Sequence, residues 1–504
     1  MNENKRYFPL KFLIMAMIYL IFGASLFLLL PRIYQQLRSF NAVVFILKSA
    51  LALKVLNSNF SPSAKCSWIF LILTVPFIAI PIYFTFYHPK SSKKEKRLLE
   101  EISRQKPKRD AFYSFLPLHN TDDYSIAREI CRAQNTPAYS GCDTKYLGSA
   151  KEKKELLLSD IKGAKSFIFL EFYTIATGHF WGEIFAVLRE KALHGVEVRI
   201  IWDEIGSLTR TPLGFKRMLA KFGIHAVSFR ERRGLFIGGM NNRNHRKLAI
   251  IDGKISYTGG INIADEYINP KKRIKAWKDV GIRILGDATN ELTYIFLSDF
   301  SLICGRCESF SKYYRYSEKK STEYILPFSD GPQPIYTQKN ARLAILSLLF
   351  YAKRCVTVTT PYLILDSDMV SAICETVRRG VKVRIIIPSI PDRYSAFLLT
   401  RSYAERLIRA GVEIYEYTPG FLHAKIYIAD EKYAILGSVN LDYRSLWHNF
   451  ESGVCIFGTD TVAQIAKDVE KILSESAPFR SAARPFLLPK RITQALAEIF
   501  APLF

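Results

Sequence analysis

The sequence has little cysteine and no arrangement of cysteines typical of a secreted mini-domain. Eight cysteines are scattered through 504 residues, which is too sparse for a disulfide framework, so we expect most of them to be reduced. Cys304 and Cys307 form a lone C-x-x-C pair without a second pair at zinc-finger spacing. This favours two cysteines near a helix end over a metal site. We predict neither a metal nor another cofactor.

Acidic residues are also comparatively few. Asp and Glu number 46 against 71 Lys and Arg, which gives a formal net charge of +25. Such an excess indicates an anionic partner, either nucleic acid or acidic lipid, and charge alone does not choose between them. The apolar content of 49% and the aromatic content of 13% exclude a chain that is disordered throughout.

Two long runs in the N-terminal part contain no charged residue. Residues 12–30 and residues 66–87 are both uncharged, although Pro76 and Pro81 should kink the second run. Because a bilayer core needs about 20 apolar residues of helix, we predict two transmembrane helices over these runs. Residues 42–56 are apolar apart from two lysines and a serine, a pattern that predicts a helix lying in the membrane interface.

The flanking charges predict how these segments are oriented. No small-x-small cleavage site precedes Arg32, so the first run is predicted to be an uncleaved anchor rather than a signal peptide. Basic residues lie before the first run and are dense in the predicted linker at 91–110. This favours a multi-pass protein with both ends, and therefore the catalytic domains, in the cytoplasm. The linker is expected to be attracted to anionic headgroups, and it can at the same time be a solvated spacer.

Beyond about residue 110, short β-branched runs alternate with amphipathic stretches, which predicts an α/β fold. Strands are expected at 166–173, 196–203, 247–251 and 255–258, then at 355–362, 381–387 and 412–417, with helices at 180–194 and 367–379. The order of elements in the first half recurs in the second. The predicted domains are a membrane region at 1–90, the linker at 91–110, a first repeat at 111–310 and a second at 311–504.

A motif, H-x-K-x4-D-x6-G-[GS]-x-N, occurs once in each repeat. Five residues recur at an offset of 178 positions: His245, Lys247, Asp252, Gly259 and Asn262 correspond to His423, Lys425, Asp430, Gly437 and Asn440. One histidine on a strand is usually an ordinary core residue, but two copies in register argue against that interpretation. Two carboxylates also correspond, Asp279 and Glu451, at an offset of 172, so the first repeat contains a six-residue insertion.

The residue types in this motif suit phosphoryl chemistry. A histidine and a lysine two residues apart on a strand point to the same face. The imidazole can act as nucleophile or proton carrier, and the ammonium can neutralise an oxyanion. The glycines allow close backbone approach, and Asn262, Asn440 and Ser438 are predicted phosphate ligands. Two copies around a pseudo-twofold axis would form one pocket.

The motif strings HRKLAIIDGKISYTGGIN and HAKIYIADEKYAILGSVN resemble the two H-x-K motifs of the phospholipase D superfamily. With Thr360-Pro361-Tyr362 and the string from Asp442 to Glu451, the chain resembles bacterial cardiolipin synthases most closely. The second copy has Glu431 where the first has Gly253, and Asp299 is followed by Phe300 where the family often has tryptophan.

This resemblance implies a reaction and a set of roles. It implies a membrane-bound phosphatidyltransferase that joins two phosphatidylglycerols into cardiolipin and releases glycerol through a phosphohistidine, without a metal ion. His245 is then the nucleophile and His423 the acid/base, with Lys247 and Lys425 neutralising charge. The implied location is the bacterial plasma membrane, and the implied partners are anionic phospholipids and the membrane, with no nucleic acid.

The carboxylates of the motif region are expected to divide into two roles. Asp279 and Glu451 are predicted to orient the histidines, each in its own repeat. Asp252 and Asp430 complete the motif and therefore stand among the catalytic candidates. Their position at the end of a strand nevertheless favours a structural role.

Three alternatives remain open from the sequence. Other phospholipase D-type hydrolases or transphosphatidylases would share the pocket and differ in the acceptor. A nuclease would suit the basic charge but gains nothing from two membrane spans, and a catalytically inactive scaffold would not need intact His and Lys pairs. Five arginines flank a glycine-rich segment before the first motif, which predicts either a loop that contacts headgroups or an ordinary surface loop: Arg230, Arg232, Arg233, Arg243 and Arg246.

Overall fold

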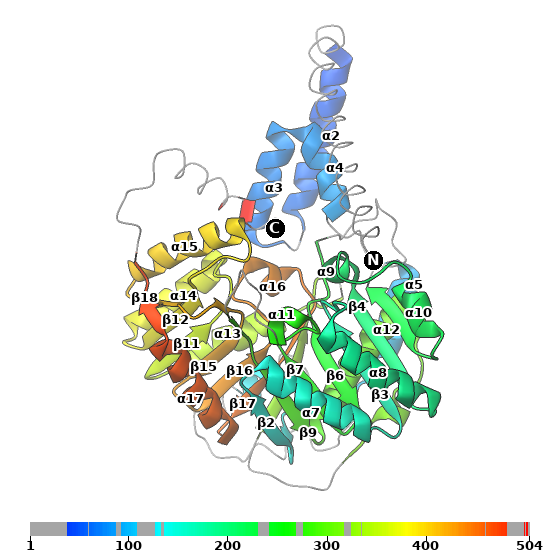
Figure 1. The fold of residues 1–504 in the computed structure, drawn as a ribbon. Helices are drawn as coiled ribbons and strands as arrows, with labels where there is room; N and C mark the ends of the chain where they lie inside the picture. The colour runs from blue at the N-terminus through cyan, green and yellow to red at the C-terminus, as the bar shows by residue number, and fades with distance from the viewer. Residues whose placement is uncertain are drawn as a thin grey trace.

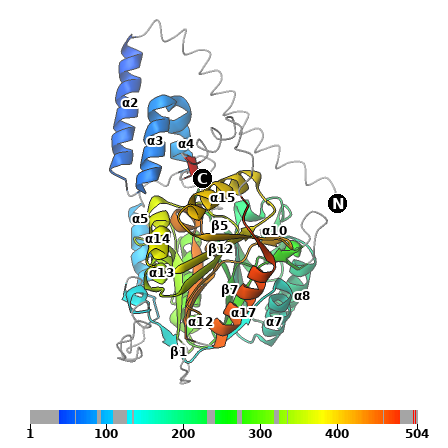
Figure 2. The same ribbon diagram turned by 90° about the vertical axis from the view of Figure 1, so that its left-hand side faces the viewer.

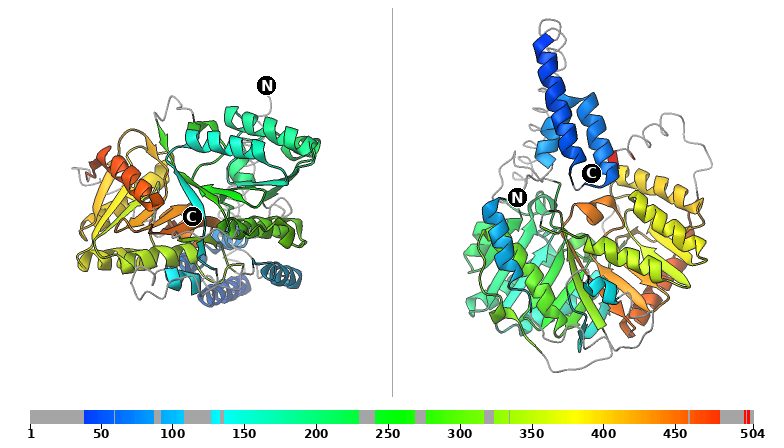
Figure 3. Two further views of the ribbon diagram at one scale, coloured as in Figure 1. Left: turned by 90° about the horizontal axis from the view of Figure 1, so that it is seen from below. Right: turned by 180° about the vertical axis from the view of Figure 1, so that it is seen from behind.

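Two α/β lobes lie side by side, and a group of N-terminal helices projects from one end of the pair (Figure 1). The computed structural model describes residues 38–58, 60–86, 92–107, 127–132, 136–229, 241–268, 276–316, 324–333, 335–458 and 460–480, with residues 498, 500 and 501. Seen from below and from behind, the two lobes remain separate bodies that meet along a central seam (Figure 3).

The first lobe is built on a seven-stranded sheet. In spatial order its strands are β2 (Asp143–Leu147), β9 (Gly281–Leu285), β7 (Ile255–Gly259), β6 (Lys247–Ile251), β3 (Phe167–Phe172), β4 (Glu197–Asp203) and β5 (His225–Phe229). Its helices are α7 (Ala150–Gly163), α8 (His179–Leu193), α9 (Glu204–Ser207), α10 (Phe215–Ala220), α11 (Asp265–Ile268) and α12 (Ala288–Cys304).

Alternate side chains of the central strand β3 pack into two different cores, as the period of a strand requires. Ile168 and Leu170 pack with α7 and α8 on one face of the sheet. Phe167 and Phe169 pack with α12 on the other face. The first sheet is therefore covered by helices on both faces, which explains why β3 is an almost continuous apolar run.

The second lobe contains a nine-stranded sheet. In spatial order its strands are β1 (Tyr139–Ser140), β10 (Tyr324–Asp330), β17 (Glu451–Phe457), β16 (Tyr433–Gly437), β15 (Ile426–Ala429), β11 (Cys355–Thr359), β12 (Lys382–Pro388), β13 (Glu413–Tyr417) and β18 (Ser476–Pro478). Its helices are α13 (Asn340–Tyr351), α14 (Ser367–Arg378), α15 (Tyr394–Ile408), α16 (Tyr443–Trp447) and α17 (Asp460–Ser474), and a 3-10 turn (Ser311–Tyr313) precedes the lobe.

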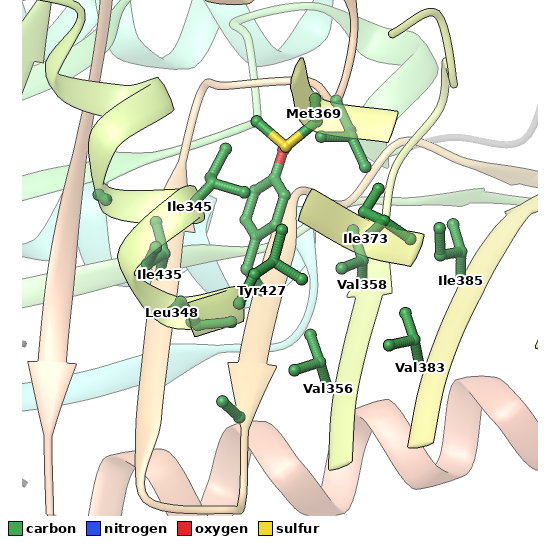
Figure 4. Packing of buried hydrophobic residues seen from close by; sticks show 14 of the residues in the cluster. Ile345, Leu348, Val356, Val358, Met369, Ile373, Val383, Ile385, Tyr427 and Ile435 are labelled. Atoms are coloured by element: carbon green, nitrogen blue, oxygen red, sulfur yellow. The ribbon is translucent and has the colours of Figure 1, made fainter. Parts of the chain in front are cut away.

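Tyr427 occupies the centre of one core of the second lobe (Figure 4). It is 1% exposed and lies among apolar side chains of α13, α14 and the sheet, including Ile345, Met369 and Val358. Its hydroxyl donates a hydrogen bond of 3.1 Å to the carbonyl of Val439, so the one polar atom of this side chain is satisfied inside the core.

The prediction of two tandem α/β repeats is confirmed, and the observed strands lie within a few residues of the expected ones. The two lobes do not divide cleanly in the sequence, however. Strand β1 pairs with β10 of the second sheet, and residues 127–131 contribute apolar side chains to the core of the second lobe. The chain therefore enters the second lobe before it builds the first.

The turn that follows each motif strand has the same backbone conformation in both repeats. Asp252 and Gly253 have φ angles of 53° and 68°, and Asp430 and Glu431 have φ angles of 53° and 58°. The substitution of Glu431 for glycine therefore leaves the turn intact, although it places a non-glycine residue in the left-handed region.

The membrane prediction is wrong. Among the helices that the structure describes, none is long and apolar enough to cross a membrane. The expected span at 66–87 consists of two shorter helices, α3 (Pro62–Thr74) and α4 (Pro76–Phe86). Pro76 separates them, because a proline disfavours helical geometry at the residue before it. That residue, Val75, has φ −132° and ψ 59°.

Helices of this size are also too short for the task. With 13 and 11 residues, α3 and α4 extend about 20 Å or less, whereas a hydrocarbon core is about 30 Å thick. The expected span at 12–30 lies outside the described residues. The predicted multi-pass arrangement in the plasma membrane, with cytoplasmic catalytic domains, is contradicted by this finding.

The segments around α3 and α4 also have defined structure. Helix α2 (Arg38–Leu56) covers the predicted interfacial stretch, and it packs with α3 and α4 around Trp68 and Tyr83. Figure 2 shows the three helices standing beside one another above the lobes. The predicted polybasic linker contains α5 (Lys93–Ser103), whose Leu98 and Ile102 pack into the core of the first lobe.

Candidate active site

Two short backbone crossings between the lobes position the motif histidines. Strand β14 (Phe421–Leu422) runs parallel to β8 (Trp277–Lys278) of the first repeat, and the backbone N–H of His423 donates to the carbonyl of Lys278 over 2.7 Å. In the same way Asn244 forms a parallel bridge with Phe450. The N–H of His245 donates to the carbonyl of Phe450 over 2.9 Å.

A glycine permits one of these crossings. A Cβ atom at Gly420 would lie 2.1 Å from the carbonyl oxygen of Ala276, far inside van der Waals contact. Only glycine lets the segment before His423 approach the other repeat this closely. The residues just before His423 therefore pair with those just before Asp279. In the same way, the residue just before His245 pairs with the residue just before Glu451.

The histidines and carboxylates pair across the two repeats. His245 Nδ1 lies 3.0 Å from both carboxylate oxygens of Glu451, and His423 Nδ1 lies 2.6 Å from Oδ2 of Asp279. The prediction that each carboxylate serves its own repeat is therefore wrong. Sequence offsets identify equivalent residues, but they do not show that the two equivalent segments exchange partners.

These contacts define the state of each imidazole. Both carboxylates are completely buried, with side chains 0% exposed. A buried carboxylate accepts a proton donor, so Nδ1 of each ring carries hydrogen and Nε2 keeps its lone pair. Nε2 is thus the atom available to attack a phosphorus atom or to exchange a proton.

Burial keeps both histidines neutral. Burial lowers the pKa of His245, and the attraction of Glu451 only partly opposes this. For His423, burial and the neighbouring Lys425 lower the pKa to about 4, against the opposing effect of Asp279. Near pH 7 both rings are therefore uncharged in the ligand-free protein, as a nucleophile or general base requires.

The motif lysines lie beside their histidines, and their pKa values are also lowered. Both are 0% exposed, and their ammonium groups donate to the backbone carbonyls of His245 and His423. Burial lowers the pKa of Lys247 well below its usual value and that of Lys425 to about 8. An arriving phosphate would be attracted to both ammonium groups and would favour their charged forms.

The carboxylates stay ionised despite their burial. Burial raises the pKa of Glu451, but His245 and Lys247 outweigh this and lower it overall. Burial likewise raises the pKa of Asp279, and Lys425 and His423 reverse the effect. Two charged, buried carboxylates therefore face two neutral histidines across the seam between the lobes.

The predicted phosphate ligands have protein partners in this structure. Asn262 Nδ2 donates to the hydroxyl of Tyr267 over 2.7 Å, and Asn440 Nδ2 donates to Asp442 over 2.9 Å. The hydroxyl of Ser438 donates to Glu451. Ser438 thus contacts one dyad directly, and Tyr267, the partner of Asn262, has its ring centroid 5.8 Å from that of His423. The role of all three residues as phosphate ligands stays a prediction.

Asp252 and Asp430 contact backbone rather than histidine. The carboxylate of Asp252 accepts backbone N–H groups of residues 165, 166 and 167 at 2.7–2.9 Å. Asp430 accepts those of residues 353, 354 and 355 at 2.8–2.9 Å. Each aspartate thus ties its motif turn to the start of the neighbouring central strand, β3 or β11, which favours the structural of the two roles considered from the sequence.

A buried arginine behind His245 was missed by the sequence analysis. Arg246 is 0% exposed and its guanidinium pairs with Asp299. It also donates to the carbonyls of Glu451 and Asp330, both over 3.1 Å. Arg246 therefore does not belong to a surface or headgroup loop, and residues 230–240 lie outside the described part of the chain. A signal existed, because a residue between His245 and Lys247 in an extended segment points away from the face that carries those two side chains.

The C-x-x-C pair lies where the simpler interpretation expected it. Cys304 is the last residue of α12, and Cys307 donates to the carbonyl of Glu308. All eight cysteines are free thiols. Within the described segments, no three His, Cys, Asp or Glu side chains are grouped as ligands for a metal ion.

Comparison with known proteins agrees with this geometry. Residues 157–276 and 345–473 match the family described as "Cardiolipin synthase, PLD-like domain". A cardiolipin synthase from Halalkalibacterium halodurans is 30% identical over 438 residues, which cover 85% of this chain and 86% of that protein. The chain belongs to the cardiolipin synthase family. It is accordingly a phosphatidyltransferase of the phospholipase D type.

Two further matches extend the likeness. An uncharacterised protein of Streptococcus mutans is 34% identical over 462 residues. These residues cover 90% of this chain and 99% of that protein. The crystal structure of phosphatidylserine synthase from Haemophilus influenzae matches 76% of the chain and 98% of its own, with a TM-score of 0.57 and 16% identity. This second likeness concerns the fold.

Proposed function

We propose that the protein joins two phosphatidylglycerol molecules into cardiolipin and releases glycerol through a phosphohistidine intermediate. The observation that carries this proposal is the pair of crossed dyads, His245 with Glu451 and His423 with Asp279, beside two buried lysines in a member of the cardiolipin synthase family. Two neutral imidazoles, each with a lone pair on Nε2, supply one nucleophile and one proton carrier.

In the first step, Nε2 of His245 attacks the phosphorus atom of the donor lipid. A phosphorus–nitrogen bond forms while the bond between phosphorus and the oxygen of the headgroup glycerol breaks. His423, protonated when the anionic substrate raises its pKa, gives its proton to the departing glycerol oxygen. Lys247 and Lys425 neutralise charge on the phosphoryl oxygens as it develops.

In the second step, a second phosphatidylglycerol takes the place of the released glycerol. His423, now neutral, accepts the proton of the lipid's terminal hydroxyl as that oxygen attacks phosphorus. The phosphorus–nitrogen bond breaks and restores His245, and the product carries two phosphatidyl groups on one glycerol. Glu451 holds His245 in one tautomer in both steps.

The exposed apolar surface of the projecting helices also supports a lipid substrate. Large apolar side chains are exposed on α2, α3, α4 and the residue between the last two: Val43, Phe45, Ile46, Leu47, Leu53, Leu56, Phe70, Leu73, Val75, Ile78 and Phe84. Exposed apolar surface of this extent marks an interaction site. In the proposal, this surface lies against the layer of lipid that supplies both substrates.

The direct test incubates the purified protein with phosphatidylglycerol alone and identifies the products by lipid mass spectrometry. Cardiolipin and glycerol in equal amounts are expected. Phosphatidic acid as the main product would identify a hydrolase and overturn the proposal. A parallel reaction with a chelator should proceed at the same rate, whereas a large loss that one divalent ion restores would contradict the lysine-based mechanism.

A further inference from the structure

Three arginines act electrostatically on Tyr173, a neighbour of His245 in the active site. The ring centroids of Tyr173 and His245 are 5.1 Å apart, and Lys247 Nζ lies 5.5 Å from the Tyr173 ring. Arg243, Arg393 and Arg444 all interact electrostatically with Tyr173. Arg243 precedes the first motif, whereas the other two belong to the second repeat.

Arg243 is buried with an unused donor. It is 4% exposed, and its Nε has no hydrogen-bond partner among the residues that the structure describes. An open donor is costly for a buried polar group. Its carboxylate neighbour is Asp203, 3.5 Å away, but Asp203 already accepts backbone N–H groups from residues 205, 206 and 244. This open donor suggests that Arg243 binds a ligand.

The positive charges in this group also repel one another. Arg444 donates to the carbonyl of Asn241 over 3.0 Å. Burial, together with repulsion from Arg243 and Arg393, lowers the pKa of Arg444, although Tyr173 and Asp442 oppose this effect. An anion bound among the three guanidinium groups would relieve this repulsion and satisfy the open donor.

We propose that Arg243, Arg393 and Arg444 bind the phosphate of the acceptor phospholipid, the phosphate that does not react. This inference rests on the proposed function. The acceptor carries its attacking hydroxyl and its own phosphodiester on the same glycerol. When the hydroxyl reaches the phosphorus atom on His245, the second phosphate must lie one glycerol away. The three arginines act on Tyr173, whose ring lies 5.1 Å from the ring of that histidine.

The site would determine the choice of acceptor. Water and small alcohols can attack the same phosphohistidine, but they carry no phosphate for the arginines to hold. Donor binding and the first step do not need the second phosphate at all. Loss of an arginine should therefore lower transfer to a phospholipid acceptor more than transfer to a small alcohol.

The test measures two products in one reaction. The full-length protein is given phosphatidylglycerol vesicles with ethanol, which competes as acceptor and yields phosphatidylethanol. In Arg243→Gln, Arg393→Gln and Arg444→Gln, we expect the ratio of cardiolipin to phosphatidylethanol to fall by about tenfold or more, the effect of losing one hydrogen bond to a charged group. Arg393 is an exposed residue, so its variant is the one least dependent on refolding of a buried site.

The matched control is Arg378→Gln. Arg378 lies on the outer face of α14, 71% exposed and paired with Glu375, and the ratio should not change. Equal losses of both products in the three variants, or an unchanged ratio, would overturn the acceptor site while the wild-type protein still makes cardiolipin. Wild-type protein that makes phosphatidylethanol but no cardiolipin would overturn the proposed function and the acceptor site together.

Discussion

The two repeats carry the same motif but support their dyads differently. Glu451, which serves His245, also accepts the hydroxyl of Ser438 and the side-chain amide of Asn449. The residue equivalent to Ser438 is Gly260, where a Cβ atom would lie 2.1 Å from the carboxylate of Asp279. Asp279 accepts only its neighbouring backbone N–H, that of Val280, in addition to His423 among the bonds described.

A second difference concerns the ring nitrogens. His245 Nδ1 faces Glu451, whereas His423 Nδ1 lies 2.6 Å from Asp279 and 2.7 Å from the ammonium of Lys425. The two neighbours of His423 make opposite demands on that nitrogen, and the ionised carboxylate requires it to be a donor. Both rings therefore donate from Nδ1, but among the described contacts only the Nδ1 of His423 also has an ammonium group within hydrogen-bonding distance. The protonation of His423 is thus the more sensitive of the two to a neighbouring charge, which suits the proton carrier of the proposed mechanism.

The largest effect should come from removing either imidazole. His245→Ala and His423→Ala should each reduce cardiolipin formation by about 10²- to 10⁴-fold or more, because each removes a whole role in the reaction. Turnover of phosphatidylglycerol by folded variants, checked by circular dichroism, provides the measurement. More than about a tenth of the wild-type rate in either variant would show that the histidines do not share one reaction.

The carboxylates come next. Glu451→Gln and Asp279→Asn should lower kcat by about 10- to 100-fold with little change in KM, since the imidazoles remain but lose their fixed tautomer. Asp252→Asn and Asp430→Asn should instead lower the melting temperature, because they tie backbone segments together. A larger loss of kcat in this second pair than in the first, in well-folded protein, would reverse the assignment of orienting and structural roles.

Exchanging the small residue beside each carboxylate probes the difference between the repeats directly. Gly260→Ala should force Asp279 away from His423 and lower kcat by about 10- to 100-fold, like loss of the carboxylate itself. Ser438→Ala removes one of several bonds to Glu451 and should cost only about 3- to 10-fold. Steady-state kinetics of both variants decide the matter, and equal losses would mean that the two repeats support their dyads alike.

The lysine of the second repeat should set an alkaline limit. The pKa of Lys425 is about 8 in the ligand-free protein, so its charge is present at neutral pH and is lost as the pH rises through that value. The ratio kcat/KM, which reports the free enzyme, should therefore fall above about pH 8. In Lys425→Arg the rate should be lower overall but the alkaline fall should move to higher pH, and an unmoved limb would assign it to another group.

The smallest effect concerns the motif turn. Glu431 is an exposed residue with a φ of 58°, where the first repeat uses Gly253. Glu431→Gly should raise the free energy of unfolding by about 0.5–1 kcal/mol, because it relieves a left-handed non-glycine conformation. Denaturant titration measures the change, and kcat serves as the control that should stay constant. A lower free energy of unfolding in the variant would contradict the claim that Glu431 is strained.

The sequence predicted what depends on local pattern. The motif strands, the equivalence of the repeats and the choice of Asp279 and Glu451 as partners of the histidines follow from spacing and residue type. Their crossed pairing does not, because it joins residues that are 144 and 206 positions apart through backbone contacts such as Phe421 against Trp277. Hydropathy failed for residues 66–87, since it counts apolar residues but not the break before Pro76.

The crossed pairing itself can be observed by nitrogen-15 NMR of histidine side chains in the full-length protein. His245→Gln and His423→Gln assign the two imidazoles by the disappearance of their signals. We predict that Glu451→Gln changes the tautomer signals of His245 and leaves those of His423 in place, while Asp279→Asn does the reverse. If each substitution instead altered the histidine of its own repeat, the composite site described here would be contradicted.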